Sequence, residues 1–375
     1  MNKENVKRIL KKTLFYKVCI AVIKVRKIVN SPTYFPEYRR KSKLRRYYDN
    51  VIWLLEYRRH NPSYNLYGLD VKNFRNQNDY VDIKYIRKNR LAPHHEDEAV
   101  VKHRKENITI RYSLLADDKY VFYTYMNGIL PGITPKLHFV FQGNKVISPI
   151  DKSEEVTTAQ AFMGLKDGKY VSKAVIGAFG DSITVIEKSN DKIIFDNGTL
   201  DNDSYFEKTS GEPYLVQDFI YQHRAMSILN PTSVNTIRII STRWNQKTCI
   251  LAAMVRIGVD EQLVDNASSG GTFVGINVAE GTLMKYGYYY NKKREENHPV
   301  SGITYEGFRI PFWKESIALI KKIHPIIFGL STIGWDIAIT DEGPVIIEIN
   351  WNYSIKGIQI ACGGLKPKWE ELKSK

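Results

Sequence analysis

Residues 334–350 read GWDIAITDEGPVIIEIN, two apolar runs separated by a short polar stretch. The pattern predicts a β-hairpin, because both runs are rich in β-branched residues and the stretch between them has the composition of a turn. Strand alternation places Glu348 and Asn350 on one face, and Asp336 on the partner strand can reach that face. Carboxylate and amide oxygens are ligands that Mg²⁺ prefers. The sequence therefore predicts a metal site at Asp336, Glu348 and Asn350, with a structural polar cluster as the alternative.

Two strand-like runs upstream of this hairpin each contain one arginine. Arg238 lies in residues 235–240 and Arg256 in residues 252–257, both among apolar neighbours. Because an arginine is costly to bury without an anionic partner, two of them on neighbouring strands predict a shared anion, with phosphate the natural candidate. Strands that turn their arginines to the surface are the alternative.

A lysine precedes a glycine-containing loop in residues 170–187, YVSKAVIGAFGDSITVIE, which we expect to form a strand, a loop and a second strand. Lys173 can place its ammonium group over phosphates while the loop from Gly177 to Gly180 covers them. The stretch matches neither a Walker loop nor a Rossmann turn, and an ordinary hairpin is the alternative.

Two further stretches are candidate ligand contacts. Residues 213–220, PYLVQDFI, predict a strand that leads into polar sequence and can offer backbone groups to an adenine edge. Residues 264–273, VDNASSGGTF, predict a loop that a ligand can approach closely. A core strand and a plain turn are the alternatives. The candidate residues are Gln217, Asp218, Phe219, Ile220, Asn266, Gly270 and Gly271.

Composition indicates a folded protein of two or three lobes, with 375 residues of which 43% are hydrophobic. The cysteines Cys19, Cys249 and Cys362 form no CxxC pair, which argues against a disulfide framework or a zinc ribbon and suits a reducing cytosol. The net charge is +15, but residues 1–46 hold fifteen Lys and Arg against two acids and so carry +13 of it. No nucleic-acid-binding motif accompanies this charge, so we expect no nucleic-acid partner.

The basic N-terminal arm has apolar residues at helical spacing, at Leu10, Leu14, Val18 and Val22. Its apolar stretch is too short and too charged to span a membrane, and it has no signal-peptide cleavage site. Two interpretations remain open: an amphipathic helix on an anionic membrane surface, or a helix packed on the protein's own body. We therefore expect a cytoplasmic protein, with peripheral attachment to the inner face of the membrane under the first interpretation.

The segments NPTSVNTIRI (230–239), VDNASSGG (264–271) and GWDIAITDEGPVIIEINWN (334–352) together resemble the ATP-grasp superfamily. The resemblance is to the sugar-transfer-associated ATP-grasp proteins of polysaccharide gene clusters. It implies an α+β ATP-grasp fold, with two α+β lobes clasping ATP. A basic, mostly helical N-terminal region (1–105) would precede a catalytic region (106–375), divided into a small-lobe part (106–215) and a large C-terminal lobe with the metal site (216–375).

The resemblance also implies roles for the candidate residues. The cofactors would be ATP and two Mg²⁺ ions, with Lys173 on the α- and β-phosphates and the Gly177–Gly180 loop closing over them. Residues 217–220 would form the adenine hinge. Arg238 and Arg256 would face the γ-phosphate or an acyl phosphate. Asn266, Gly270 and Gly271 would line the acceptor end, and Asp336, Glu348 and Asn350 would bind Mg²⁺. The loop departs from the family in having Ala178 and Phe179 where many members have glycine.

By the same resemblance, the activity is that of a carboxylate–amine ligase that forms an amide through an acyl phosphate. The expected substrates are a sugar acid, free or lipid-linked, and an amine such as an amino acid, joined in surface polysaccharide (capsule) biosynthesis. By position, we expect residues 286–290 and 291–312 to line the acceptor pocket. The alternative is a phosphotransferase (kinase) acting on a sugar or glycan precursor. A non-enzymatic scaffold and a Ser/His/Asp hydrolase have weaker support.

Overall fold

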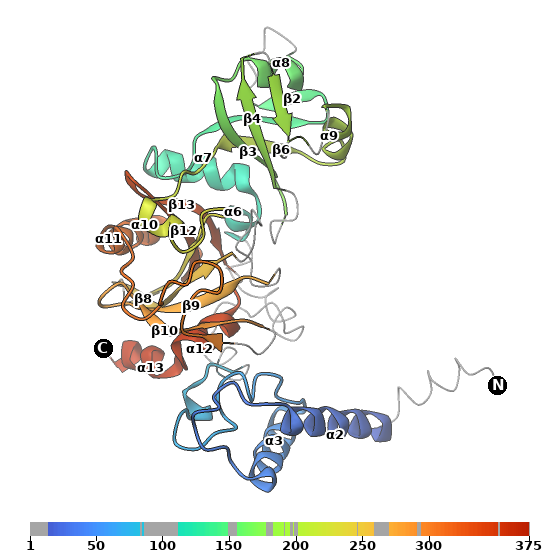
Figure 1. The fold of residues 1–375 in the computed structure, drawn as a ribbon, viewed down its shortest axis with the longest axis vertical. Helices are drawn as coiled ribbons and strands as arrows, with labels where there is room; N and C mark the ends of the chain where they lie inside the picture. Colours follow the sequence, from blue (N-terminus) through green and yellow to red (C-terminus); the bar gives the residue numbers. More distant parts are fainter. Residues whose placement is uncertain are drawn as a thin grey trace, which may run out of the picture.

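A computed structural model describes residues 14–82, 85, 112–148, 156–177, 183–190, 192–195, 198, 202–245, 247–258, 270–290, 294–351 and 353–374. It contains two antiparallel sheets and a helical N-terminal region, which follow one another along the long axis of the molecule (Figure 1). The α+β fold class expected from the sequence is therefore confirmed.

The small sheet has six strands in the order β2-β1-β6-β3-β4-β5. Its strands are β1 (Leu137–Gln142), β2 (Lys145–Ser148), β3 (Gly168–Ala174), β4 (Thr184–Ser189), β5 (Lys192–Phe195) and β6 (Tyr214–Asp218). One face packs on α8 (Thr158–Met163) and α9 (Asn202–Lys208) through an aromatic core that includes Phe141, Phe162 and Tyr205.

The large sheet has seven strands in the order β11-β10-β9-β8-β7-β12-β13. Its strands are β7 (Ile237–Trp244), β8 (Lys247–Ile257), β9 (Thr272–Asn277), β10 (Thr282–Tyr288), β11 (Arg294–Glu295), β12 (Thr332–Thr340) and β13 (Gly343–Asn350). The strands expected around Lys173, Gln217, Arg238, Arg256 and Glu348 are thus all present, as β3, β6, β7, β8 and β13.

Helices pack on both faces of the large sheet. The remaining helices are α2 (Leu14–Asn30), α3 (Lys43–Tyr57), η1 (Gln77–Asp79), α6 (Leu114–Asp117), α7 (Lys119–Ile129), α10 (Arg224–Ser227), α11 (Trp313–Ile323), η5 (His324–Ile326), α12 (Ile355–Cys362) and α13 (Lys366–Ser374). One face packs on α7 and α11, where Ile239 and Ile337 share a core with Met126 and Ile320.

The opposite face of the large sheet carries both predicted site arginines. There, Ile240 and Met254 pack in one core with Ile358 of α12. Because side chains alternate along a strand, Arg238 and Arg256 lie on the same face as Ile240 and Met254. This face is therefore apolar under α12 and charged farther along β7 and β8.

The N-terminal region packs against the large sheet and α12. Tyr34 and Phe35 share a core with Ile358, and the buried Gln359 side chain accepts a hydrogen bond from the Val81 N–H at 2.9 Å. Figure 1 shows α2 and α3 at the end of the molecule opposite the small sheet. Within the described part of the chain, no helix has the length and apolar character needed to cross a membrane.

The amphipathic arm expected from the sequence is only partly described. Leu10 lies outside the described residues, as do the side chains of Leu14 and Val18, whereas Val22 is 57% exposed. Farther along α2, Val25 and Val29 are buried. The second half of this helix therefore packs on the protein's own body.

A linker joins the two sheets directly beside the predicted hinge. The Phe219 N–H donates to the Lys169 carbonyl of the small sheet at 3.3 Å, and the His223 N–H donates to the Ile339 carbonyl of the large sheet at 2.7 Å. Residues 219–223 thus connect β6 to the body of the large lobe.

Candidate functional site

The predicted hairpin is formed by β12 and β13, with Thr340 paired to Gly343 across its turn. A β-bulge between Asp336 and Ile337 shifts this register by one residue, which sets Asp336 directly opposite Glu348. The Asn350 Nδ2 group donates to Asp336 Oδ2 at 3.2 Å and to Glu348 Oε1 at 3.3 Å. The three predicted metal-binding side chains therefore touch one another on one face of the sheet.

Neighbouring residues fix the position of Asp336. Gly334 is required because the chain after β13 lays Tyr353 over it, and a Cβ atom at Gly334 would meet the Tyr353 side chain at 2.8 Å. On the opposite face, Trp335 Nε1 donates to Ser241 Oγ at 2.6 Å, and that oxygen lies 2.7 Å from His324 Nδ1. A close backbone contact and a buried polar network thus hold β12 on both sides of the carboxylate.

Both predicted arginines bind Asp336. Arg238 Nε and Nη2 donate to the two carboxylate oxygens at 2.5 and 2.7 Å, and Arg256 Nη2 lies 3.1 Å from Oδ2. The exposed fractions of the three side chains are 10% for Arg238, 15% for Arg256 and 1% for Asp336. The anion that the arginines share in this structure is therefore the Asp336 carboxylate. A metal ion on Asp336 would have to share its oxygens with guanidinium groups, and its role as a ligand stays a prediction.

The two carboxylates differ in their electrostatics. Burial alone would raise the pKa of Asp336, but the charges of Arg238 and Arg256 hold it well below its usual range. Burial and then the neighbouring Asp336 charge raise the pKa of Glu348, against the opposing effects of Arg238 and Lys173. Asp336 is thus already neutralised by its partners, whereas Glu348 would gain from a further cation.

The Lys173 side chain lies on the face of β3 turned away from the core of the small lobe. Tyr170 and Ala174 belong to the aromatic core of the small lobe, so strand alternation puts Lys173 on the other face of β3. Burial lowers the pKa of Lys173 to about 8, while the charge of Glu348 raises it and that of Lys119 lowers it. Because Glu348 belongs to the large sheet, its effect on the Lys173 pKa is consistent with a position at the junction of the two lobes.

Lys119 is a site residue that sequence reasoning missed. It begins α7 directly after the N-cap Asp118, its N–H donates to the Val175 carbonyl at 3.0 Å, and its Nζ donates to the Gly177 carbonyl at 2.9 Å. Asp118 before a helical pattern is a helix-start signal, but nothing local indicates that this helix meets the end of β3. The predicted Gly177 thus lies beside Lys119, and Gly180 lies outside the described residues.

The helix start and the lysines make this side of the site positive. Burial lowers the pKa of Lys119 as well, partly offset by Glu348. The positive end of the α7 dipole adds to the two ammonium groups. The cations Lys119, Lys173, Arg238 and Arg256 meet here with the carboxylates of Asp336 and Glu348, and Asp118 and Glu212 also act on Lys119. Several cations from both lobes suit a ligand with several phosphates.

The predicted hinge residues end β6 at the edge of this junction. Gln217 is buried, and its Nε2 group donates to the Pro135 carbonyl at 3.1 Å, so its side chain is used in packing. Asp218 Oδ1 lies 2.6 Å from His138 Nε2, a partner that the sequence did not indicate. The half-buried residues 219–220 follow as the linker between the sheets.

The predicted acceptor loop is described only at its end. Gly270 has φ +99°, a conformation that favours glycine, and Gly271 is buried. They lead into β9, where Phe273 pairs with Arg256. The loop therefore ends next to the arginine cluster, and Asn266 lies outside the described residues.

The tyrosine-rich stretch 286–290 contacts the N-terminal region. The rings of Tyr288 and Phe35 lie 6.4 Å apart, and the Arg294 guanidinium stacks on Tyr286 at 3.9 Å from its centroid. Part of the stretch expected to line an acceptor pocket is thus committed to packing. Residues 291–293 lie outside the described residues.

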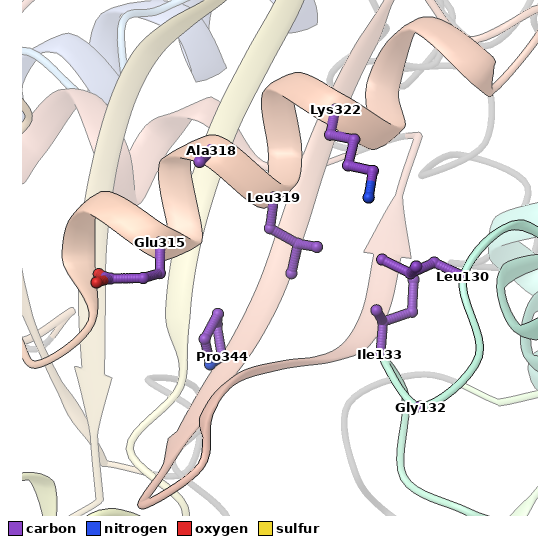
Figure 2. A pocket seen from close by; sticks show the side chains of 8 residues that line it. All are labelled: Leu130, Gly132, Ile133, Glu315, Ala318, Leu319, Lys322 and Pro344. Atoms are coloured by element: carbon purple, nitrogen blue, oxygen red, sulfur yellow. The ribbon is translucent and has the colours of Figure 1, made fainter.

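A groove lies beside Pro344, at the turn end of the hairpin (Figure 2). It is lined by Leu130, Gly132, Ile133, Glu315, Ala318, Leu319, Lys322 and Pro344. None of the predicted site residues contributes to it.

The donor set fits Mg²⁺ rather than a transition metal. Among the described residues, no three His, Cys, Asp or Glu side chains gather into a metal site. Glu348 and Asn350, with Asp336 beside them, supply oxygen donors to an ion that binds through one or two carboxylates and substrate phosphates. The residues present therefore fit the metal expected from the sequence.

Comparison with known proteins gives one family match and distant structural likenesses. No curated protein matches the chain. The D-alanine–D-alanine ligase of Helicobacter pylori is 12% identical, with a TM-score of 0.38 over 70% of this chain and 61% of that one. The ADP complex of N5-carboxyaminoimidazole ribonucleotide synthetase is 11% identical, with a TM-score of 0.38 over 64% and 46%. The L-amino acid ligase of Bacillus licheniformis is 10% identical, with a TM-score of 0.35 over 67% and 44%. This chain thus spans less than two thirds of each of these structures.

The family match covers the whole of the two-sheet body. The model of the family described as sugar-transfer associated ATP-grasp matches residues 103–373. This range includes both sheets, the arginine cluster and the carboxylate hairpin, and it is well over half of the chain. The protein therefore belongs to the sugar-transfer associated ATP-grasp family.

Proposed function

We propose that the protein is an ATP- and Mg²⁺-dependent ligase that joins a carboxylate to an amine. The observation that carries the proposal is the meeting of Lys173 from the small sheet, Lys119 from the start of α7, and Arg238 and Arg256 from the large sheet around the carboxylates of Asp336 and Glu348. Such a site can bind a triphosphate and a magnesium ion together. Family membership supports the same assignment.

The proposed reaction has two steps. An oxygen of the substrate carboxylate attacks the γ-phosphorus of ATP, the bond from that phosphorus to the β–γ bridging oxygen breaks, and an acyl phosphate and ADP result. The amine nitrogen then attacks the acyl carbon, phosphate leaves with the electron pair of the broken C–O bond, and the nitrogen loses a proton to form the amide.

The protein's own groups act mainly by position and charge. Lys119 and Lys173 would hold phosphate oxygens, and the arginines would face the negative charge that develops during transfer. Asp336 would hold the two guanidinium groups in place. Mg²⁺ bound at Glu348 and Asn350 would neutralise phosphate charge.

The substrates proposed are a sugar acid and an amine such as an amino acid, joined during the synthesis of a surface polysaccharide. The description of the family as sugar-transfer associated supports a sugar substrate. The phosphotransferase alternative would use the same cations but would leave the γ-phosphate on a sugar hydroxyl.

A hydroxylamine trap separates the two reactions. The full chain would be incubated with ATP, Mg²⁺ and a panel of uronic acids, each with mixed amino acids or with hydroxylamine. We expect ADP, free phosphate and a hydroxamate with one carboxylate, because hydroxylamine intercepts an acyl phosphate. ADP with a phosphorylated sugar and no hydroxamate would replace the ligase by a kinase.

The affinity for ATP is expected to fall as the pH rises through 8. The pKa of Lys173 is lowered to about 8, so above that pH the free enzyme loses this positive charge and must take up a proton to bind phosphate. The affinity for ATP should fall by about tenfold per pH unit, up to the pKa that Lys173 has in the complex with ATP. Titration of a fluorescent ATP analogue between pH 7.5 and 9.5, at about 0.15 M salt, measures it.

Two lysine variants control this experiment. Lys173→Arg should bind with a shallower pH dependence, because arginine stays charged throughout this range. Lys169→Arg, four residues earlier on β3, should keep the wild-type profile. A flat wild-type profile would remove Lys173 from the phosphate site.

A further inference from the structure

The amphipathic helix α3 turns an apolar stripe outward, to solvent. The members of this α3 stripe are Leu44 (83% exposed), Tyr48 (56%), Val51 (43%), Ile52 (42%) and Leu55 (72%). Their spacing of four, seven, eight and eleven residues from Leu44 confines them to an arc of about 100° on the helix. Exposed apolar residues that are so ordered form one continuous surface.

The opposite side of α3 is the side that packs. Asn50 is fully buried, and its Nδ2 group donates to the Arg46 carbonyl at 2.9 Å. Trp53 stacks on Tyr57 with ring centroids 4.0 Å apart. The helix therefore turns a mixed polar and aromatic face inward and leaves the α3 stripe exposed.

Positive charge surrounds the α3 stripe. Lys43 and Arg45 are exposed at the start of the helix, and Arg58 and Arg59 are exposed directly after its end. The neighbouring helix α2, which packs on α3, adds three exposed cations, Lys24, Arg26 and Lys27, and two exposed apolar residues, Val22 and Ile23. The helix α3 contains two acids, Asp49, which is paired with Lys41 and Arg45 at 2.9 Å each, and the exposed Glu56 near its end, so the cations around the stripe outnumber the acids.

We propose that the α3 stripe and the basic residues around it dock the protein on an anionic lipid bilayer. An apolar helix face flanked by lysine and arginine matches the boundary between acyl chains and negative head groups. A second copy of this chain is a poorer occupant, because pairing two such surfaces would bring like charges together. Docking would use the end of the molecule opposite the small sheet, so it would leave the junction between the sheets accessible (Figure 1).

Vesicle co-sedimentation of the full chain tests the proposal. The vesicles would be phosphatidylcholine alone, or phosphatidylcholine with about one third phosphatidylserine. We expect binding to the anionic vesicles only, weakened at about 0.5 M NaCl. The double variant Leu44→Gln/Leu55→Gln should bind at least about tenfold more weakly. Glutamine is a good helix former, so circular dichroism and the melting temperature should stay unchanged.

A matched control and an oligomer measurement exclude the other occupants. Ile326→Gln changes a 50% exposed isoleucine outside the N-terminal region and should bind vesicles as the wild type does. No binding to anionic vesicles, or equal binding by the double variant, would overturn the proposal. A wild-type dimer in light scattering that the double variant converts to a monomer, without any vesicle binding, would instead assign the stripe to a second copy. None of these outcomes depends on the ligase activity.

Discussion

The variant Glu348→Gln is expected to lose ATP turnover by about 100-fold or more while staying folded. Unlike Asp336, Glu348 forms no bidentate pair with an arginine. Burial and the neighbouring Asp336 charge raise its pKa, so both disfavour the charged form of Glu348. Glutamine keeps the shape of the side chain but removes the charge that a magnesium ion needs. ADP release at saturating ATP and Mg²⁺ measures the effect.

Stability should change in the opposite direction to activity. Because the raised pKa means that the folded state disfavours the Glu348 charge, a neutral amide should raise the melting temperature in metal-free buffer. The wild type should gain stability from added Mg²⁺ and ATP, and the variant should gain less. This combination separates a ligand residue from one whose replacement damages the fold.

Glu342→Gln is the matched control for this prediction. It lies in the turn of the same hairpin and is exposed, so turnover and melting temperature should stay close to wild type. Full ATP turnover in Glu348→Gln would remove the metal assignment from this residue.

The hairpin was predictable because its information is local. Two apolar runs and a polar turn define both strands and the pairing of Thr340 with Gly343. The pairing of Asp336 with Glu348 also needs a register shift between Asp336 and Ile337, which the sequence pattern does not show. The same reasoning identified the strand that carries Lys173. In each case the pattern of a few neighbouring residues predicts the strand, although the bulge in the hairpin decides which residues of its two strands lie opposite one another.

The partners of Asp336 could not be predicted in this way. They depend on the strand order β8-β7-β12-β13, which brings Arg238 and Arg256 to Asp336 from far along the chain. An arginine in an apolar run indicates that an anionic partner is present, but it does not identify that partner. Lys119 was missed for the same reason, because its place beside Gly177 follows from where α7 meets β3.

The orientation of α3 was also beyond sequence reasoning. A helical pattern shows that an apolar stripe such as Leu44, Tyr48 and Leu55 exists, but ordinarily predicts that it faces the core. Here the buried Asn50 faces inward instead, and Trp53 and Tyr57 on the same side of the helix are half-buried. Only the packing of the N-terminal region decides between the two orientations.

Asp336→Asn is expected to lower the free energy of unfolding by about 3–5 kcal/mol. The substitution removes the charge that pairs with the largely buried guanidinium groups of Arg238 and Arg256. The wild-type protein keeps the stabilisation from the charged Asp336 until strongly acidic pH. The pKa of Asp336 is depressed in the folded state, so this stabilisation is lost only as the pH falls to that depressed pKa. Urea unfolding followed by tryptophan fluorescence, with Trp335 buried beside the cluster, measures the change.

An exposed ion pair provides the control for this cluster. Lys285 and Glu296 lie 3.4 Å apart with side chains 44% and 54% exposed, so Glu296→Gln should cost less than about 1 kcal/mol. The double variant Arg238→Gln/Asp336→Asn should lose less stability than the sum of the two single variants, because the second change removes a charge that the first left unpaired. Equal stability losses for Asp336→Asn and Glu296→Gln would show that the arginines find other partners. Asp336→Asn is expected to lower both stability and activity, so a loss of activity in this variant does not distinguish a metal ligand from a structural residue. The metal site is therefore tested at Glu348.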